Sequence, residues 1–179
     1  MAAIMREILR KYPNCEFGRE LFPGNLIPIL RVSGGKTTAD VADWGYLTQK
    51  GKRVYNARSE TLLEKPLFGK DFVQNRCVIP VTGFCEWDGD GTGWDFLPQE
   101  EEMLYLAGFC RKKTEGWEAT VVTEHASGCV GEIHHRTPLI LSGENLRQWL
   151  YDEALARQFL EEAKERVLLK RKKMEGETL

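Results

Sequence analysis

Long apolar runs are missing from this 179-residue sequence, in which 42% of the residues are hydrophobic and 29% are charged. No run approaches the roughly 18 apolar residues that a membrane-spanning helix needs. The first residues, MAAIMREILRKY, are charged and lack the apolar centre of a signal peptide. We therefore expect no membrane association, no secretion and a single cytoplasmic globular domain over residues 1–179.

An excess of charge of one sign is also missing. The chain has 25 Lys+Arg and 27 Asp+Glu, which gives a formal net charge of −2. This balance excludes a strongly basic nucleic-acid-binding protein. It leaves room for a local basic cleft, because the electrostatic field that attracts a ligand is a local property.

Paired cysteines are missing as well. The five cysteines are an odd number and form no CxxC motif; they are Cys15, Cys77, Cys85, Cys110 and Cys129. This favours reduced thiols in a cytoplasm over a disulfide framework. The one loose zinc candidate is Cys129 with His134 and His135, but buried structural thiols are the better interpretation. We expect no metal and no cofactor.

Apolar periodicity predicts helices at both ends of the chain and short strands between them. Ile4, Ile8, Leu9 and Tyr12 share one helical face, Ser59 is placed to cap a short helix, and further helices begin near Ser142 and Asp152. The predicted strands cover residues 26–32, 42–47, 76–81, 83–87, 103–110, 117–123 and 139–141, with Pro28 indicating an edge strand.

These elements predict an α+β domain with a mostly β, antiparallel core, as an open sheet or a closed barrel, and flanking helices. Residues 88–93, DGDGTG, predict a hairpin loop. Residues 152–179 are expected to form a C-terminal helix and a basic tail. The basic run of residues 170–173 is interpreted as a solvated helix end in preference to a DNA-binding tail.

Glu86 is the most informative polar residue. Alternation along its strand puts Phe84 and Glu86 on one face and Cys85 and Trp87 on the other. A carboxylate beside apolar side chains has a raised pKa and suits general acid/base chemistry. A strand-end carboxylate in water remains an equal alternative.

Other polar candidates lie in three further blocks. His134 precedes Arg136, a neighbour that favours a neutral imidazole base, although an exposed loop histidine fits as well. Arg58 is suited to a phosphate, and Asn56 offers an amide to a sugar or base. Trp44 and Trp87 are either stacking platforms for bases or core residues.

The order of these blocks resembles the SRAP (SOS response associated peptidase) family. The blocks are Trp44-Gly45, NARSET at residues 56–61, RCVIPxxGFxEW at residues 76–87 and IHxRxP at residues 133–138. The resemblance extends from about residue 23 to residue 149.

The resemblance implies a protein that recognises abasic sites in single-stranded DNA during the SOS response to DNA damage. In this family an N-terminal cysteine captures the opened sugar aldehyde as a thiazolidine, because its amine forms an imine and its thiol closes the ring. Asn56 would position the nucleophile and the sugar, Glu86 would be the acid/base and His134 would assist proton transfer. Arg58 and Arg136 would hold phosphates, and Trp44 and Trp87 would line the DNA cleft.

The sequence departs from the family pattern at its start. The family opens with Met-Cys-Gly-Arg and a short strand, whereas this sequence opens with Met1-Ala2-Ala3-Ile4 and runs directly into a helix. Without that cysteine, the covalent, peptidase and lyase activities implied by the family are not expected of the sequence as written. The explanations are a start codon assigned too late, which we favour, a shortened polypeptide, or a degenerate relative.

Smaller departures are Cys85, where the family usually has Tyr, and His135 and Thr137, where an acidic residue and Met are usual. The alternative function is a non-catalytic module that binds single-stranded DNA or a protein partner. We expect a monomer that associates with the nucleoid when bound to DNA, and the sequence identifies no protein partner.

Overall fold

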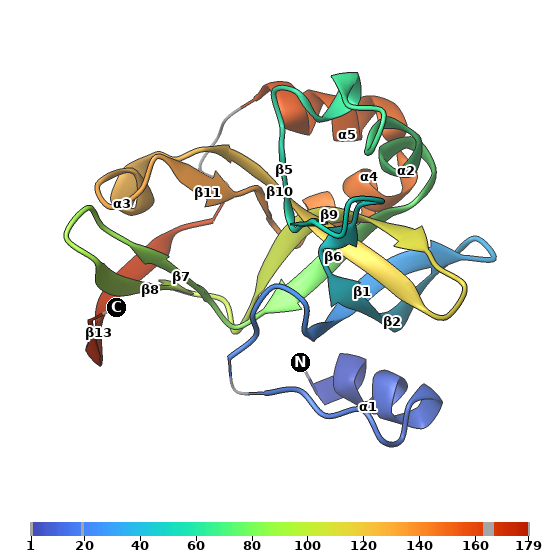
Figure 1. The fold of residues 1–179 in the computed structure, drawn as a ribbon, viewed down its shortest axis with the longest axis horizontal. Coiled ribbons are helices and arrows are strands. Elements are labelled where there is room, and N and C mark those ends of the chain that lie inside the picture. Colours follow the sequence, from blue (N-terminus) through green and yellow to red (C-terminus); the bar gives the residue numbers. More distant parts are fainter. Residues whose placement is uncertain (1, 19, 163–166, 179) are drawn as a thin grey trace.

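The computed structural model describes residues 2–18, 20–162 and 167–178 (Figure 1). Its helices are α1 (Ala2–Lys11), η1 (Leu62–Glu64, a 3-10 helix), α2 (Gly69–Gln74), α3 (Gly128–Gly131), α4 (Asn145–Tyr151) and α5 (Glu153–Glu161). Its strands are β1 (Leu26–Ser33), β2 (Lys36–Trp44), β3 (Tyr46–Leu47), β4 (Arg53–Val54), β5 (Asn56–Arg58), β6 (Arg76–Val81), β7 (Phe84–Trp87), β8 (Thr92–Pro98), β9 (Leu104–Lys112), β10 (Trp117–His125), β11 (Arg136–Pro138), β12 (Ile140–Leu141) and β13 (Leu169–Thr178).

Five strands close into a ring. The strands pair in the order β10, β2, β1, β6 and β9, and β9 pairs again with β10. Most of these pairs are antiparallel, but β10 runs parallel to β2 and to β5. The predicted α+β fold with a mostly antiparallel β core and flanking helices is therefore confirmed. Of the two alternatives left open, the core adopts the closed barrel, with two parallel pairings added.

Two apolar clusters lie on opposite faces of the ring strands, because successive side chains of a strand point in opposite directions. In β6, Val78 belongs to the cluster that also holds Trp149 of α4 and Phe72 of α2, whereas Ile79 belongs to the other. The helices α2, α4 and α5 therefore cover one side of the barrel, as Figure 1 shows.

A three-stranded sheet of β7, β8 and β13 projects beside the barrel (Figure 1). The hairpin loop predicted at residues 88–93 is confirmed, since β7 pairs antiparallel with β8 across it. The basic run Lys170–Lys173 was predicted to be a helix end, and this is wrong: it lies on β13, where Lys172 is opposite Asp95 of β8.

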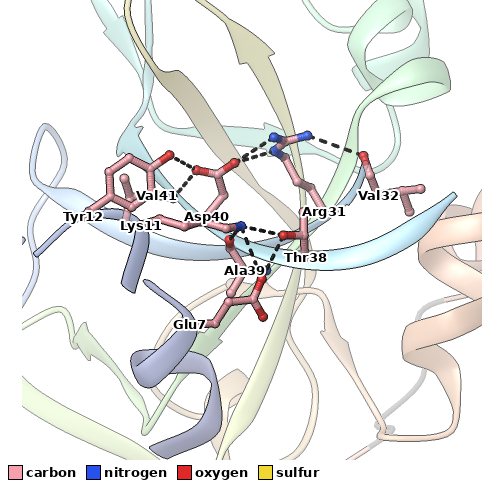
Figure 2. A network of polar contacts seen from close by, with 9 residues as sticks. All are labelled: Glu7, Lys11, Tyr12, Arg31, Val32, Thr38, Ala39, Asp40 and Val41. Atoms are coloured by element: carbon pink, nitrogen blue, oxygen red, sulfur yellow. Dashed lines mark hydrogen bonds and ion pairs between the residues drawn. The ribbon is translucent and has the colours of Figure 1, made fainter. Parts of the chain in front are cut away.

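The N-terminal helix docks on β2 through polar contacts (Figure 2). The Tyr12 hydroxyl donates to Oδ1 of Asp40 at 2.5 Å, and Arg31 donates from Nε and Nη2 to Oδ2 of the same carboxylate at 2.9 and 2.7 Å. Glu7 Oε1 accepts from the Ala39 backbone N–H at 3.0 Å. Asp40 is buried, so these contacts replace the water that its charge would otherwise need.

Several local predictions need correction. Pro28 does not mark an edge strand, because β1 lies between β2 and β6; β6 pairs only with Leu30 and Arg31, beyond the proline. Ser59 caps no helix: the only helical turn there is η1, whose N-cap is Thr61. The strand expected over residues 42–47 is interrupted at Gly45, whose φ of +106° favours glycine.

At the C-terminal end, the Asp152 side chain caps α5 as predicted by accepting from the Leu155 backbone N–H at 3.0 Å. The helix ends at Glu161, and residues 163–166 of the predicted C-terminal segment lie outside the described residues. In the described part of the chain, no helix is both long and apolar enough to cross a membrane.

Candidate functional site

Glu86 lies on β7, on the face occupied by stacked aromatic side chains. The Phe84 and Phe96 rings stack with their centroids 5.2 Å apart, and Glu86 is opposite Trp94 of β8. Burial raises the pKa of the Glu86 carboxyl, and this effect exceeds the opposing effects of His134 and of the Trp87 backbone N–H. The carboxyl is thus partly desolvated, which agrees with the first of the two interpretations from the sequence, and its side chain remains 26% exposed.

His134 lies in the loop between α3 and β11 and faces Glu86. Its Nδ1 atom is 3.6 Å from Oε2 of Glu86. The same nitrogen lies 3.0 Å from the carbonyl oxygen of Arg136 and 3.2 Å from its backbone nitrogen. The His135 ring is next to it, with the centroids 4.4 Å apart. The histidine is therefore held between the Glu86 carboxylate and the Arg136 backbone.

Strand β10 brings two distant sequence blocks together. Its residue Thr123 is in register with Arg58 of β5 in parallel pairing and with Pro138 of β11 in antiparallel pairing. Asn56 and Arg58 are exposed, whereas Ala57 between them is buried. Both candidate residues of β5 thus face solvent beside β10.

The Arg136 guanidinium is tied down and does not project freely into solvent. Nη1 donates to Oε1 of Glu60 at 2.6 Å, while Nη2 donates to Oε2 of Glu60 at 3.1 Å and to the Thr123 carbonyl at 2.6 Å. The Arg136 side chain is only 11% exposed. The hydrogen bonds from Arg136 lower the pKa of Glu60, so the pair is ionic. A phosphate would have to share this guanidinium with Glu60.

Trp44 lies beside the start of β5. Its indole Nε1 donates to the carbonyl of Tyr55, the residue before Asn56, at 3.2 Å. The Tyr55 ring meets the Trp44 ring edge to face, with the centroids 6.3 Å apart, and Tyr55 is 43% exposed. The two aromatic rings therefore contact each other at the residue that precedes the exposed Asn56.

Trp87 is on the opposite face of β7 from Glu86. It pairs with Gly93 of β8, and a Cβ atom at that glycine would lie 3.3 Å from the Trp87 Nε1 and 2.6 Å from the Met174 sulfur. The missing side chain of Gly93 thus lets Trp87 and Met174 approach the strand. Trp87 remains half-buried.

None of the cysteines in the described part of the chain forms a disulfide, and three of the thiols have a raised pKa. Burial raises the pKa of Cys15 and of Cys77. Burial and a hydrogen bond to Asp95, 3.1 Å away, raise the pKa of Cys85 to about 12. Among the residues that the structure describes, no group of three or more His, Cys, Asp or Glu side chains is arranged to hold a metal ion.

Contacts therefore connect Glu86, His134 and Arg136, while Asn56 and Arg58 join this group through β10. Trp44 joins it through Tyr55, and Trp87 lies on the other face of β7. Sequence reasoning gave no role to Glu60, Thr123 or Tyr55. The sequence pointed only to Glu60, as an acidic residue within the NARSET block. It gave no indication that Arg136 in the distant block is its partner.

The sequence model of the family described as SOS response associated peptidase (SRAP) matches residues 8–175. Abasic site processing protein YoqW of Bacillus subtilis (strain 168) is 32% identical over 119 residues, which cover 62% of this chain and 53% of YoqW. Abasic site processing protein HMCES of Gallus gallus is 34% identical over 124 residues, covering 53% of this chain and 37% of HMCES. The chain thus spans about half the length of YoqW and less than half the length of HMCES.

Solved structures share the fold. An X-ray structure of a protein from Bordetella bronchiseptica matches with a TM-score of 0.77 at 22% identity, covering 93% of this chain and 94% of that one. A structure from Bacteroides thetaiotaomicron matches with a TM-score of 0.75 at 20% identity, covering 97% and 87%. At these identities the likeness concerns the fold.

Proposed function

The chain belongs to the SRAP family, and from that premise we propose that it binds single-stranded DNA at abasic sites and promotes opening of the abasic sugar. The names of relatives such as YoqW and HMCES, abasic site processing proteins, support a role at this lesion. The observation that carries the chemical part is the half-buried Glu86 carboxyl, with its raised pKa, 3.6 Å from Nδ1 of His134.

The chemistry needs one proton donor and one proton acceptor. An abasic deoxyribose is a cyclic hemiacetal; opening it breaks the bond between C1′ and the ring oxygen, adds a proton to that oxygen and removes one from the C1′ hydroxyl. A carboxyl with a raised pKa keeps its proton closer to neutral pH and can donate it. Glu86 is the proposed donor, and His134 accepts or relays the proton from the hydroxyl.

The exposed residues around this pair suit a single strand. Arg58 presents a guanidinium to a backbone phosphate, and Asn56 presents an amide beside it. The Trp44 and Tyr55 rings offer faces for base stacking, which tolerates any sequence because every base has a π-face. Arg136 contributes a partly shared positive charge, and Trp87 a second stacking surface on the far side of β7.

Covalent capture is the finer part of the proposal and requires an N-terminal cysteine. In a chain that carries one, the α-amine condenses with the aldehyde and releases water, and the thiol adds to the resulting imine to close a thiazolidine. The carbon skeletons of sugar and cysteine are then joined by one C–N and one C–S bond. Asn56 would position these groups for the reaction.

Aldehyde trapping tests the ring-opening step without any cysteine. The 179-residue protein is mixed with a single strand that carries one natural abasic site, and an alkoxyamine in solution traps the open aldehyde. The protein should accelerate trapping, and Glu86→Gln should remove most of the acceleration while leaving DNA affinity unchanged. Asp90→Asn, an exposed change in the neighbouring hairpin loop, is the control and should behave as the wild type.

The same experiment distinguishes the proposed function from the alternative function. A non-catalytic binding module would bind the strand but leave the trapping rate unchanged in both wild type and Glu86→Gln. If the wild type bound an abasic strand and an intact strand with equal affinity, recognition of the lesion would no longer be part of the proposal.

A further inference from the structure

Glu60 lies where two separate parts of the site meet. It follows β5, four residues after Asn56, and its carboxylate reaches the side chain of Arg136 on β11. Between them runs β10, whose Thr123 carbonyl accepts from both the Ser59 backbone N–H at 2.8 Å and the Arg136 guanidinium at 2.6 Å. The carboxylate thus joins the end of β5 to the strand that follows His134.

The Arg136 side chain depends on Glu60 for half of its hydrogen bonds. Within the described part of the chain, its Nε atom is buried without a hydrogen-bond partner. Among the described residues, Glu60 supplies the carboxylate that binds the guanidinium, and Thr123 supplies the remaining acceptors. A buried guanidinium that loses its carboxylate must move toward water, because an uncompensated buried charge is costly.

The backbone of Arg136 in turn holds His134. The Arg136 carbonyl oxygen and backbone nitrogen both lie within hydrogen-bond distance of the His134 Nδ1 atom, at 3.0 and 3.2 Å. Nδ1 faces two oxygen atoms, this carbonyl at hydrogen-bond distance and the Glu86 carboxylate at an ion-pair distance of 3.6 Å, against one N–H donor. This favours a proton on Nδ1 and leaves the other ring nitrogen, Nε2, as the proton acceptor.

We propose that Glu60 is a positioning residue for His134: by holding the Arg136 guanidinium, it fixes the Arg136 peptide groups that orient the imidazole toward Glu86 and set its tautomer. This deepens the proposed function, on which it rests, and assigns Arg136 a structural task besides any contact with phosphate. This positioning role explains why the Glu60 carboxylate binds the Arg136 guanidinium, which the sequence led us to expect at a DNA phosphate.

NMR of the histidine ring nitrogens tests this on the 179-residue protein without DNA. The chain has three histidines, so the signals can be assigned from single substitutions. In the wild type, the His134 ring should show protonated Nδ1 and unprotonated Nε2. Glu60→Gln keeps the side-chain shape but loses the charge, and should move the two nitrogen shifts toward each other as the tautomers mix. Arg136→Lys should do the same, because it keeps the charge and loses the fork.

Two further variants complete the test. Glu60→Asp retains the carboxylate and should restore part of the wild-type separation between the two nitrogen shifts. Glu64→Gln, an exposed change on η1, should leave the separation unchanged. Unchanged His134 nitrogens in Glu60→Gln would overturn the proposal, whether or not the Arg136 side-chain signals move. Because no DNA is present, a failure of the wild type to bind abasic strands would leave this result standing.

Discussion

The Oε2 atom of Glu86 lies 3.6 Å from Nδ1 of His134, although the two residues are 48 positions apart and His134 lies in a loop outside the sheet that contains Glu86. Glu86 is on β7, and His134 precedes β11 at the edge of the barrel sheet. The small β7–β8–β13 sheet is thereby held against the barrel at the point where proton transfer is proposed. A carboxyl with a raised pKa beside an imidazole is an arrangement suited to general acid/base catalysis.

Replacing Glu86 by Gln should stabilise the fold at neutral pH. Because burial raises the pKa of Glu86 in the folded protein, its stabilising contribution is complete below the unfolded value, about 4.3, and is lost as the pH rises through the folded value. Gln resembles the neutral acid at every pH. The melting temperature of Glu86→Gln should therefore exceed that of the wild type at pH 7, by about 2–4 °C for each kcal/mol regained.

The comparison at low pH is the control for this prediction. Near pH 4 the wild-type carboxyl is largely protonated, so the two melting temperatures should converge. A constant difference between pH 4 and pH 8 would mean that Glu86 is not desolvated in the folded protein.

Arg58→Ala should weaken DNA binding equally for strands of any sequence. Arg58 is exposed on β5, and a phosphate contact releases counterions when it forms. Loss of one contact should reduce the slope of log K against log salt by about 0.7 for a single strand. Fluorescence titrations at several salt concentrations measure this, with Lys50→Ala in the exposed turn as control. A slope equal to that of the wild type would exclude Arg58 from the DNA contact.

Trp87→Ala should affect binding more than stability. Trp87 is half-buried and packs over Gly93 beside Met174, so it resembles a supported stacking surface more than a core residue. We expect a loss of about 1–3 kcal/mol in affinity for single-stranded DNA. Trp149→Ala is the contrasting variant: Trp149 is fully buried, and its loss should cost about 3–5 kcal/mol of stability. A fall in melting temperature without a fall in affinity would place Trp87 in the core.

Asp40→Ala should strongly destabilise the protein. The side chain of Asp40 is 5% exposed and accepts hydrogen bonds from Arg31 and Tyr12 (Figure 2). Removal leaves the partly buried Arg31 guanidinium without its carboxylate, which should cost about 3–5 kcal/mol in urea unfolding. Asp43→Ala on the same strand removes the more exposed ion pair with Lys113 and should cost at most about 1 kcal/mol. Similar losses in the two variants would contradict the assignment of the buried network.

The pH dependence of Asp40 provides a second check. Burial alone would raise its pKa, but hydrogen bonds from Tyr12 and Arg31 outweigh burial and hold the pKa below its usual value. The stability that it contributes is thus present above pH 4 and is lost as the pH falls through the folded value. The extra acid sensitivity of the wild type should be absent from Asp40→Ala.

Local patterns in the sequence predicted most strands correctly, because alternation and turn residues act over a few positions. The strand of residues 76–81, the hairpin at residues 88–93 and the Asp152 cap are examples. Closure of the barrel was left open, since the parallel pairing of β10 with β2 depends on contacts between residues about 75 positions apart.

The errors have the same origin in distant contacts. The basic run of residues 170–173 has the composition of a helix end, but pairing with β8 makes it a strand. Among the site residues, the desolvation of Glu86 was one of two equal alternatives that its apolar strand neighbours suggested. The attachment of Arg136 to Glu60 was not predicted, because the two residues are 76 positions apart and meet only when β5 and β11 flank β10.

The 179-residue polypeptide should form no heat-stable adduct with abasic single-stranded DNA. Once Met1 is removed, Ala2 offers an amine that forms a reversible imine but no thiol to close a thiazolidine. Three of the five internal thiols are unsuited to replace it: Cys77 and Cys110 are at most 1% exposed, and the pKa of Cys85 is raised to about 12. A denaturing gel after heating should show free DNA, whereas borohydride reduction should trap the imine.

A version that begins Met-Cys-Gly-Arg, followed by a short strand leading into α1, should give the stable adduct. The same extension with Cys replaced by Ser is its control and should give none, since a hydroxyl is a much weaker nucleophile than a thiolate at neutral pH. Glu86→Gln in the extended chain should slow adduct formation, because the aldehyde must form before it is captured. A heat-stable adduct from the 179-residue chain itself would show that Cys15, Cys129 or a lysine acts as the nucleophile, and would overturn the thiazolidine chemistry proposed for this site.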